Sequence, residues 1–276
     1  MNKLVNCGLE NRFGTNCLKW DGLKSRFGNE NLIAMWVADM DFKAPQPVID
    51  ALKERVNHGI FGYNIIPDSY YEAFINWEKE KHGYNVKKEW IRFSPGVVPA
   101  LFWFINILTN PGDSCIVMGP VYYPFHDAIK ENERKLIFNN LKNDNGIYTI
   151  DFEKFEEDII ENQVKLFILS SPHNPIGRVW TKEELKRVLD ICKANDVFVL
   201  ADEIHQDIII GDKKQIPAAT IGNYDDILVT LTAATKTFNL ASCQNSFVVI
   251  PNDEIREKFD KYYNSIGGDN GNVFGY

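Results

Sequence analysis

The sequence predicts an α/β fold with a mostly parallel central sheet and helices on both faces, in three layers. Short apolar runs rich in β-branched and aromatic residues recur along the chain, which is typical of strands buried on both faces of a parallel sheet. Amphipathic helical patterns lie between these runs, and strands that alternate with helices indicate an α/β architecture. The predicted strands are 115–118, 166–169, 197–200, 227–231 and 247–250.

Helix signals support this order. Thr181 and Glu184 stand three residues apart ahead of an apolar stripe, which is the pattern of a capping box at the start of a helix. The stripe within 151–160 predicts a second helix, and Pro45 opens a third. Residues 99–108 predict a fourth helix, directly after a loop that contains a glycine.

Composition narrows the class of protein. The 276 residues are 45% hydrophobic and 25% charged, as in ordinary soluble globular proteins. A net charge of −8 argues against nucleic acid or a membrane surface as a partner, because both are negatively charged. The five cysteines form no Cys-x-x-Cys pair, so we expect reduced thiols, a cytoplasmic location and no metal site.

Three polar residues in a fixed order indicate the chemistry. Asn174, Asp202 and Lys236 follow one another at intervals of 28 and 34 residues, and each interval is long enough for a strand–helix–strand unit. A lysine can bond to the aldehyde of pyridoxal phosphate, and a carboxylate can pair with its ring nitrogen. An amide can donate to the phenolic oxygen. Each motif alone is a weak signal, but together and in this order they predict a pyridoxal phosphate site.

With these motifs, the chain resembles the fold-type I pyridoxal phosphate enzymes of the class I/II aminotransferase superfamily. Within that superfamily it is most similar to the MalY/PatB-type cystathionine β-lyases, also called C–S lyases. The block 35–42 and the Asp-Glu-Ile-His variant at 202–205 favour the lyase branch over general transaminases. The resemblance covers nearly the whole chain and rests on the blocks 35–42, 61–63, 94–101 and 119–125, besides the three motifs above.

The resemblance implies a role for each polar residue. Lys236 is the lysine that bonds to the cofactor and then removes the substrate α-proton, so its pKa must lie well below the ordinary value of about 10.4. Asp202 follows the apolar run 197–201, at the strand end where open α/β sheets bind ligands. Asn174 is expected to bind the phenolic oxygen. His205 either contacts that oxygen, supports Asp202, or is purely structural.

A phosphate needs backbone amides at a helix N-terminus. Gly96, Val97 and Val98 precede the helical run 99–108 and are predicted to supply them, with Thr235 adding a hydroxyl. The chain departs from its relatives here. Many of them carry proline and serine just before the lysine, where this chain has Ala234 and Thr235. Many transaminases also carry a phosphate-binding arginine eight residues past the lysine, where this chain has Gln244.

Aromatic and N-terminal residues complete the predicted site. Tyr122 is expected to stack on the cofactor ring as a catalytic residue, with Tyr123 as its competitor. Tyr63 is implied to reach the phosphate of a neighbouring subunit, which predicts a homodimer with a shared active site. The substrate side is predicted to be lined by Trp36, Ala38 and Asp39, although packing within the core is nearly as good an interpretation of Trp36.

The resemblance also divides the chain. Residues 1–45 are expected to contribute to a small domain and 46–276 to form the large cofactor-binding domain. Relatives are about a third longer, and their remaining residues build most of the small domain, with an arginine that binds the substrate carboxylate. No residue of this chain matches that arginine. The C-terminal small domain is therefore expected to be absent from this chain, either through truncation or because a separate polypeptide supplies it.

These observations predict a pyridoxal phosphate-dependent lyase that cleaves L-cystathionine or other cysteine S-conjugates to a thiol, pyruvate and ammonia. An aminotransferase is the first alternative, because general motifs do not separate reprotonation of the cofactor from loss of the β-substituent. The second alternative is a binding protein that retains the fold without catalysis. The MalY-type family contains a member that also binds a transcription regulator, which supports that alternative.

Overall fold

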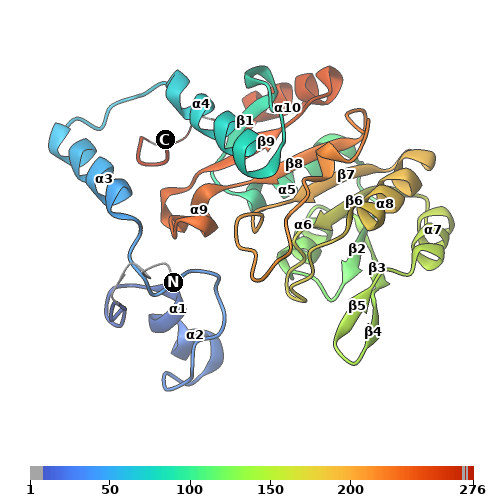
Figure 1. The fold of residues 1–276 in the computed structure, drawn as a ribbon, viewed down its shortest axis with the longest axis horizontal. Helices are drawn as coiled ribbons and strands as arrows, with labels where there is room; N and C mark the ends of the chain where they lie inside the picture. The colour runs from blue at the N-terminus through green and yellow to red at the C-terminus, as the bar shows by residue number, and fades with distance from the viewer. Residues whose placement is uncertain (1–8, 269–270, 272) are drawn as a thin grey trace.

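The computed structural model describes residues 9–268, 271 and 273–276. Its centre is a seven-stranded sheet flanked by helices, as the sequence predicts (Figure 1). The strands are β1 Ile91–Ser94, β2 Ser114–Gly119, β3 Lys135–Asn140, β6 Val164–Ser170, β7 Phe198–Asp202, β8 Leu228–Thr232 and β9 Ser246–Val249. Their order across the sheet is β1-β9-β8-β7-β6-β2-β3.

The five predicted strands are confirmed as β2, β6, β7, β8 and β9. Strands β3, β2, β6, β7 and β8 pair in parallel, but β9 runs antiparallel to both β8 and β1. Burial on both faces marks a central strand whatever its direction, so the apolar run at 247–250 could not show the reversal. The sequence analysis also missed β1 and β3, which form the two edges of the sheet.

Helices connect the strands and cover the sheet. The longer ones are α3 Gln46–His58, α4 Asp68–Trp77, α5 Val97–Leu108, α6 Pro124–Glu131, α7 Phe152–Glu161, α8 Lys182–Ala194 and α10 Asp253–Ser265. Short ones are α1 Leu18–Asp21, α2 Leu23–Phe27 and α9 Ala234–Thr237, with a π-helical turn at Glu78–His82 and 3₁₀ turns at Lys88–Trp90, Ala218–Thr220 and Ala241–Cys243. A hairpin joins β4 Lys142–Asp144 to β5 Ile147–Thr149.

The predicted helices are present, and the start of one of them is confirmed in detail. The Thr181 hydroxyl accepts a hydrogen bond from the Glu184 amide at 3.1 Å, and the Glu184 carboxylate accepts one from the Thr181 amide at 2.8 Å. This reciprocal pair is the predicted capping box of α8. Asp151 caps α7 in the same manner, with its carboxylate on the Lys154 amide. Helix α5 begins at Val97, two residues before the predicted start.

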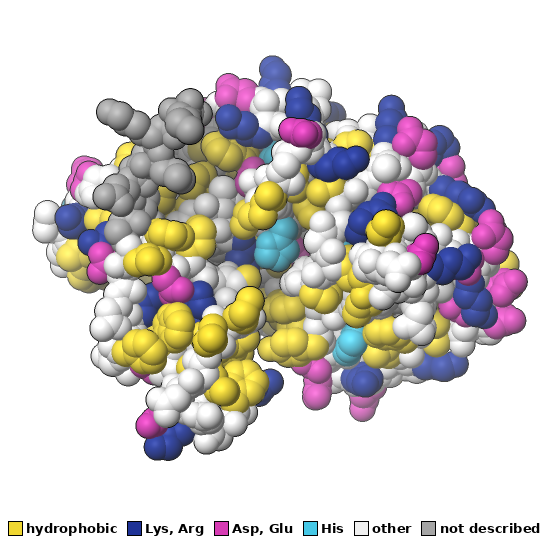
Figure 2. Space-filling view, turned by 60° about the horizontal axis from the view of Figure 1, so that its bottom comes forward, with side chains coloured by type: hydrophobic (Ala, Val, Ile, Leu, Met, Phe, Trp, Pro, Cys, Tyr) yellow, Lys and Arg dark blue, Asp and Glu magenta, His cyan; other side chains and the backbone are white. Residues whose placement is uncertain are grey.

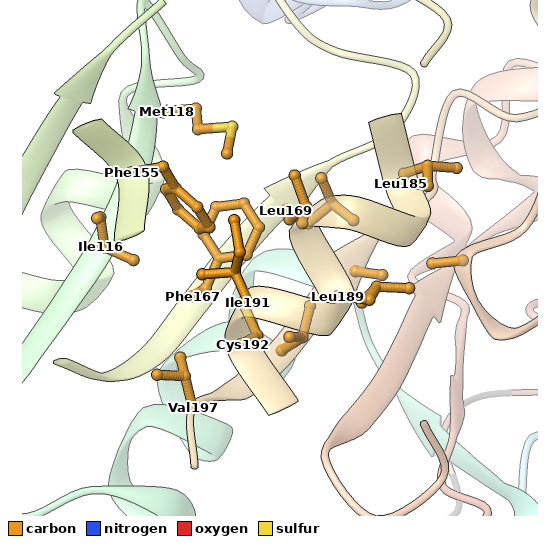
Figure 3. Packing of buried hydrophobic residues seen from close by; sticks show 14 of the residues in the cluster. Ile116, Met118, Phe155, Phe167, Leu169, Leu185, Leu189, Ile191, Cys192 and Val197 are labelled. Atoms are coloured by element: carbon orange, nitrogen blue, oxygen red, sulfur yellow. The ribbon is translucent and has the colours of Figure 1, made fainter. Parts of the chain in front are cut away.

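Alternate side chains of each strand point to opposite faces, so every central strand contributes to two apolar layers. On one face Val117, Ile168 and Leu200 pack against α5, α6 and α10. On the other face Ile116 and Phe167 pack against α7 and α8, where the side chains interdigitate (Figure 3). Helix α4 covers the β1–β9 edge of the sheet in a third, smaller cluster. Helices thus pack on both faces of the sheet, and this packing sets the positions of the loops at the strand ends.

Residues 9–45 lie apart from the sheet, below α3 in Figure 1. This N-terminal segment carries α1 and α2 and exposes many large apolar side chains, which appear as yellow patches over its surface in Figure 2. They are Leu9, Phe13, Leu18, Phe27, Leu32, Ile33, Met35, Met40 and Phe42. Helix α3, which follows, has no buried residue. Within the described part of the chain, no helix combines the length and apolar character needed to cross a bilayer.

Candidate active site

The predicted site residues lie along one edge of the sheet. The parallel strands β2, β6, β7 and β8 all end at this edge. Asp202 is the last residue of β7, and the segments that follow β2, β6 and β8 carry Tyr122, Asn174 and Lys236. Strand β1 ends there too, because two antiparallel pairings in succession restore its direction, and α5 starts directly after it. In open α/β sheets this carboxyl edge is where ligands bind.

Lys236 lies on α9, just past the end of β8, and its side chain is half-buried. Its ammonium Nζ donates to the Ala38 carbonyl oxygen at 3.0 Å. Burial lowers the pKa of Lys236, while the negative charges of Asp39 and Asp202 oppose that shift. A lowered pKa is what a nucleophilic lysine requires, because only the neutral amine can attack an aldehyde or accept a proton.

Asp202 is the last residue of β7 and is 7% exposed. Its carboxylate accepts a hydrogen bond from the Ile204 amide at 3.1 Å. Burial raises the pKa of Asp202 to about 7, against the opposing effects of that hydrogen bond and of the Lys236 charge. A buried carboxylate with so few partners of its own is suited to pairing with a cationic group that a ligand brings, such as a protonated ring nitrogen.

Tyr122 and Asn174 come from different loops but meet through the backbone. The Tyr122 amide donates to the Asn174 carbonyl oxygen at 3.1 Å, and the Asn174 amide donates to the Ser170 hydroxyl at 3.1 Å. Burial raises the pKa of the Tyr122 hydroxyl, and the charge of Asp202 adds to the effect. His205 lies on the same side, since burial and then the charge of Lys236 lower its pKa. The structure therefore gathers these residues around one position.

The N-terminus of α5 has the geometry expected of a phosphate cradle. Gly96 is its N-cap, with an extended backbone (φ 179°) that any residue could adopt. A Cβ atom added at Gly96 would meet only the Pro99 ring, at 3.4 Å. Neither the backbone conformation nor the packing of the chain therefore requires a glycine at position 96. A glycine there leaves space in which a bound group can approach the backbone. Val97 and Val98, in the first helical turn, have amides with no acceptor inside the helix.

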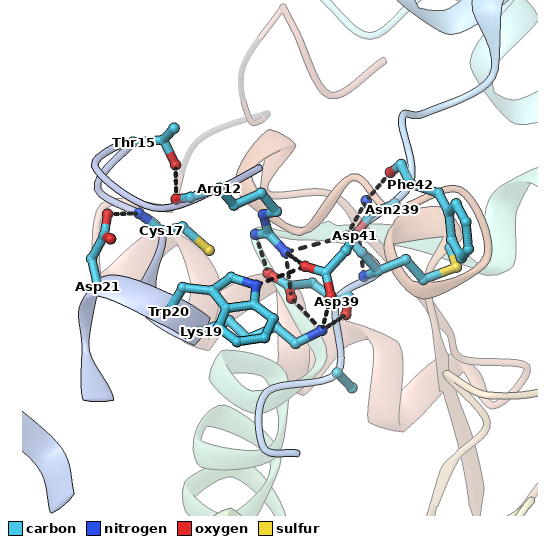
Figure 4. A network of polar contacts seen from close by, with 12 residues as sticks. Arg12, Thr15, Cys17, Lys19, Trp20, Asp21, Asp39, Asp41, Phe42 and Asn239 are labelled. Atoms are coloured by element: carbon cyan, nitrogen blue, oxygen red, sulfur yellow. Dashed lines mark hydrogen bonds and ion pairs between the residues drawn. The ribbon is translucent and has the colours of Figure 1, made fainter. Parts of the chain in front are cut away.

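The N-terminal segment reaches this site through Ala38 and Asp39. Asp39 belongs to a network of ion pairs and hydrogen bonds within that segment (Figure 4). Arg12 binds Asp39 with two hydrogen bonds, of 2.9 and 2.7 Å, and also contacts Asp41 at 3.0 Å. Lys19 donates to the Asp41 carboxylate at 2.9 Å. Hydrogen bonds from Trp20 and Lys19, with a further one from Arg12, lower the pKa of Asp41 to about 2. Ala38 and Asp39 are thus held beside Lys236 by fixed ion pairs.

Within the described residues, two further predicted residues form no hydrogen bond with Lys236 or Asp202. The Trp36 indole donates to the Lys19 carbonyl oxygen at 3.0 Å and packs edge-on against Phe27, so it takes part in the packing of the N-terminal segment, and its place on the substrate side stays a prediction. Tyr63 is fully exposed in the segment between α3 and α4. Within this chain it does not reach the group around Lys236, and its implied role in a neighbouring subunit stays a prediction.

Thr235 borders a different space. A cavity of about 600 Å³ lies between α3, α4, α9 and residues 273–276, and Thr235 is on its wall. Lys236 and Asp202 do not line it. The contact of Thr235 with the phosphate therefore stays a prediction. Gln244, where transaminases carry an arginine, ends the 3₁₀ turn Ala241–Cys243 in the left-handed conformation.

The sequence analysis missed two residues that organise the site. The Asn239 amide oxygen accepts from the Met40 amide at 3.0 Å, while its nitrogen donates to the carbonyl oxygens of Met40 and Phe42 at 3.0 and 2.9 Å. Asn239 also has a positive φ of 59°, which asparagine tolerates better than most residues. Asp207, beneath α9, accepts hydrogen bonds from three elements. Asn239 lies three residues past Lys236, and Asp207 lies five residues past Asp202. Their hydrogen-bond partners, however, are remote in sequence.

The architecture and the arrangement of its polar groups are those of the fold-type I pyridoxal phosphate class. Comparison with known proteins leads to the family. The profile of the family described as aminotransferase class I and II matches residues 30–265, and the chain belongs to this family.

Individual relatives agree with that assignment. The chain is 42% identical over 262 residues to cystathionine beta-lyase PatB of Bacillus subtilis, covering 94% of this chain and 68% of PatB. It is 31% identical to protein MalY of Escherichia coli, covering 94% of this chain and 66% of MalY. The crystal structure of cystalysin from Treponema denticola, which contains pyridoxal 5'-phosphate, superposes with a TM-score of 0.92 at 37% identity, covering 98% of this chain and 69% of cystalysin. The chain thus spans about two thirds of the length of these relatives.

Proposed function

We propose that this chain forms the pyridoxal phosphate-binding part of a C–S β-lyase. Its substrate class is L-cystathionine and other S-conjugates of cysteine, and its products are a thiol, pyruvate and ammonia. The observation that carries the proposal is the placement of half-buried Lys236 and buried Asp202 at the ends of the adjacent strands β8 and β7, in a chain 42% identical to a cystathionine beta-lyase. The residues present fit the cofactor, because each of its polar groups finds a partner of the right chemistry.

When bound, pyridoxal phosphate supplies an electron sink for the electrons of a broken bond at the substrate Cα. The side chains of this chain provide the rest. The neutral Lys236 amine would hold the cofactor through its aldehyde, with loss of water, and once freed by the substrate amine it would accept the Cα proton at Nζ. Asp202 would keep the ring nitrogen protonated, and Tyr122 would pack on the ring. Asn174 and His205 would bind the phenolic oxygen.

The phosphate would be held at the start of α5, by the amides of Val97 and Val98 next to Gly96. On the substrate side, Ala38 and Asp39 lie next to the lysine. Asp39 carries a negative charge already bound by Arg12, so it does not repel the substrate carboxylate as strongly as a free carboxylate would.

We also propose a homodimer in which Tyr63 of one subunit reaches the phosphate of the other. Full exposure of Tyr63 and the many exposed large apolar side chains within residues 9–65 support this arrangement, because exposed apolar surface is commonly buried when subunits associate. A small domain built partly from residues 1–45, with residues 46–276 as the large domain, belongs to the same proposal, but residues 1–8 lie outside the described residues. A cytoplasmic location stays a prediction.

The test is pyruvate release from L-cystathionine by the 276-residue protein with added pyridoxal phosphate. Release that is lost in Lys236→Ala supports the lyase. An aminotransferase is the second candidate, since the matching family is described by that activity. Amino transfer that depends on an added 2-oxo acid, without release of pyruvate from cystathionine, would establish that activity instead. Cofactor binding with neither reaction would leave a binding protein.

A further inference from the structure

Lys236 stands on a helix too short to hold itself in place. Helix α9 is only the four residues Ala234–Thr237, and no side chain caps its N-terminus at Ala233. A single turn of helix is unstable in water, because nucleation fixes several backbone dihedral angles for one hydrogen bond. The direction in which Lys236 points must therefore be set by contacts from outside α9.

One such contact comes from Asp207. Its carboxylate oxygen Oδ2 accepts a hydrogen bond from the Thr237 hydroxyl at 2.7 Å. Its other oxygen, Oδ1, accepts from the Trp77 indole at 3.0 Å and faces His82 Nε2 at 2.9 Å. Trp77 ends α4 and His82 ends the π-helical turn that follows, so Asp207 joins α9 to the end of α4 and to that turn.

The carboxylate is well suited to this task. The Asp207 side chain is 12% exposed, and His82 is 7% exposed. Burial alone would raise the pKa of Asp207, but hydrogen bonds from His82, Thr237 and Trp77 outweigh it and lower the pKa. Asp207 is therefore ionised at neutral pH. Hydrogen bonds to a charged acceptor are stronger and shorter than those between neutral groups.

We propose that Asp207 is a positioning residue that acts through the Thr237 hydroxyl to hold the Lys236 side chain in its half-buried setting. Successive residues of a helix point about 100° apart, so fixing Thr237 toward Asp207 turns Lys236 away from it, toward Ala38 and Asp202. Asp207 and Asp202 belong to one segment of six residues. That segment then places both the carboxylate for the ring nitrogen and the lysine.

This inference rests on the proposed role of Lys236 as the cofactor-bonding lysine, but its test needs neither cofactor nor substrate. The measurement is the rate at which a small acylating reagent labels Lys236 in the cofactor-free protein, followed by peptide mass spectrometry from pH 6 to pH 11. Only the neutral amine reacts, so the midpoint of the profile reports the pKa of Lys236. Exposed Lys165 in the same digest serves as an internal reference.

The variants form a matched set. Thr237→Val removes the hydroxyl but keeps the shape of the side chain, and Thr237→Ser keeps the hydroxyl. Thr220→Val is the control, because it removes a hydroxyl that donates to the Pro217 carbonyl oxygen at 2.8 Å in a separate 3₁₀ turn. If Thr237→Val does not fold, Thr237→Ala removes the same hydroxyl with a smaller side chain.

We expect Thr237→Val to raise the midpoint of Lys236 by about half a pH unit or more, which is about a threefold loss of neutral amine at fixed pH. The shift is upward because burial lowers the pKa of Lys236, and a loosened α9 exposes it to water. Thr237→Ser and Thr220→Val should leave the midpoint unchanged. An unchanged midpoint in Thr237→Val, or an equal shift in Thr220→Val, would overturn the proposal. Failure of the lyase assay alone would not affect it.

Discussion

The Nζ atom of Lys236 donates to the carbonyl oxygen of Ala38 at 3.0 Å, although the two residues are 198 positions apart in sequence. The contact joins the N-terminal segment to the loop at the end of β8. Ala38 follows Val37, which has a positive φ of 59°, a conformation that is costly for a β-branched residue. The backbone is therefore held in an unfavourable conformation where it meets the lysine, and such strain is typical of functional sites.

Asn239 is expected to fix the N-terminal segment to the lysine loop. Replacing it by glycine keeps the positive φ accessible but removes three hydrogen bonds to Met40 and Phe42. We expect hydrogen exchange at the Met40 amide to become about tenfold faster, equivalent to about 1.4 kcal/mol. Gln244→Gly is the control, because Gln244 also has a positive φ, of 48°, and lies outside this contact. Equal exchange in the two variants would contradict the prediction.

Arg12 is expected to stabilise residues 9–45. Arg12→Ala removes its hydrogen bonds to Asp39 and Asp41 and leaves Lys19 as the cation for both carboxylates. We expect protease cleavage within this segment to become several times faster, an effect of about 1 kcal/mol on local opening.

Lys43→Ala provides the comparison for Arg12, because the Lys43–Glu10 pair is a single contact between exposed side chains and should contribute nothing measurable. The measurement is limited proteolysis with peptide mapping. Cleavage that is as slow in Arg12→Ala as in Lys43→Ala would show that the ion pairs do not hold the segment.

Asp202 makes the stability of the cofactor-free protein depend on pH. Its pKa in the folded protein, about 7, lies above the ordinary value of 3.8, so the folded state binds this proton more tightly than the unfolded state. Its contribution to stability is complete below pH 3.8 and is lost as the pH rises through about 7. Between pH 5 and pH 8 the loss is about 3 kcal/mol at most.

Asp202→Asn should remove that part of the dependence, since an amide oxygen can still accept from the Ile204 amide. Urea unfolding at pH 5 and pH 8 without cofactor measures it, and Asp212→Asn at an exposed position is the matched control. If the free energy of unfolding depended on pH in the same way in both variants, burial would not be raising the pKa of Asp202 in the folded protein.

The sequence predicted what depends on local pattern. Apolar runs located the central strands, and the Thr181–Glu184 spacing located a helix start, because both signals arise from residues close in the chain. The reversed direction of β9 and the edge strands β1 and β3 could not be predicted, since strand direction is set by tertiary pairing.

The same distinction applies to the site. Lys236, Asp202, Asn174 and Tyr122 follow apolar strands and could be found from their position at the strand ends. Asp207 and Asn239 act through hydrogen-bond partners more than a hundred residues away. The one nearer partner is Thr237, which is 30 residues from Asp207. Trp36 had two interpretations, and only the contact with Phe27 shows that it packs within its own segment.

The most direct test of this account is whether Lys236 bonds to the cofactor. The 276-residue protein is mixed with one equivalent of pyridoxal phosphate, reduced with borohydride and digested, and the modified peptide is identified by mass. We predict that the modification lies on Lys236 and is absent from Lys236→Ala, while the exposed reference Lys165 stays unmodified. Modification spread over exposed lysines, or an unchanged yield in Lys236→Ala, would contradict the account.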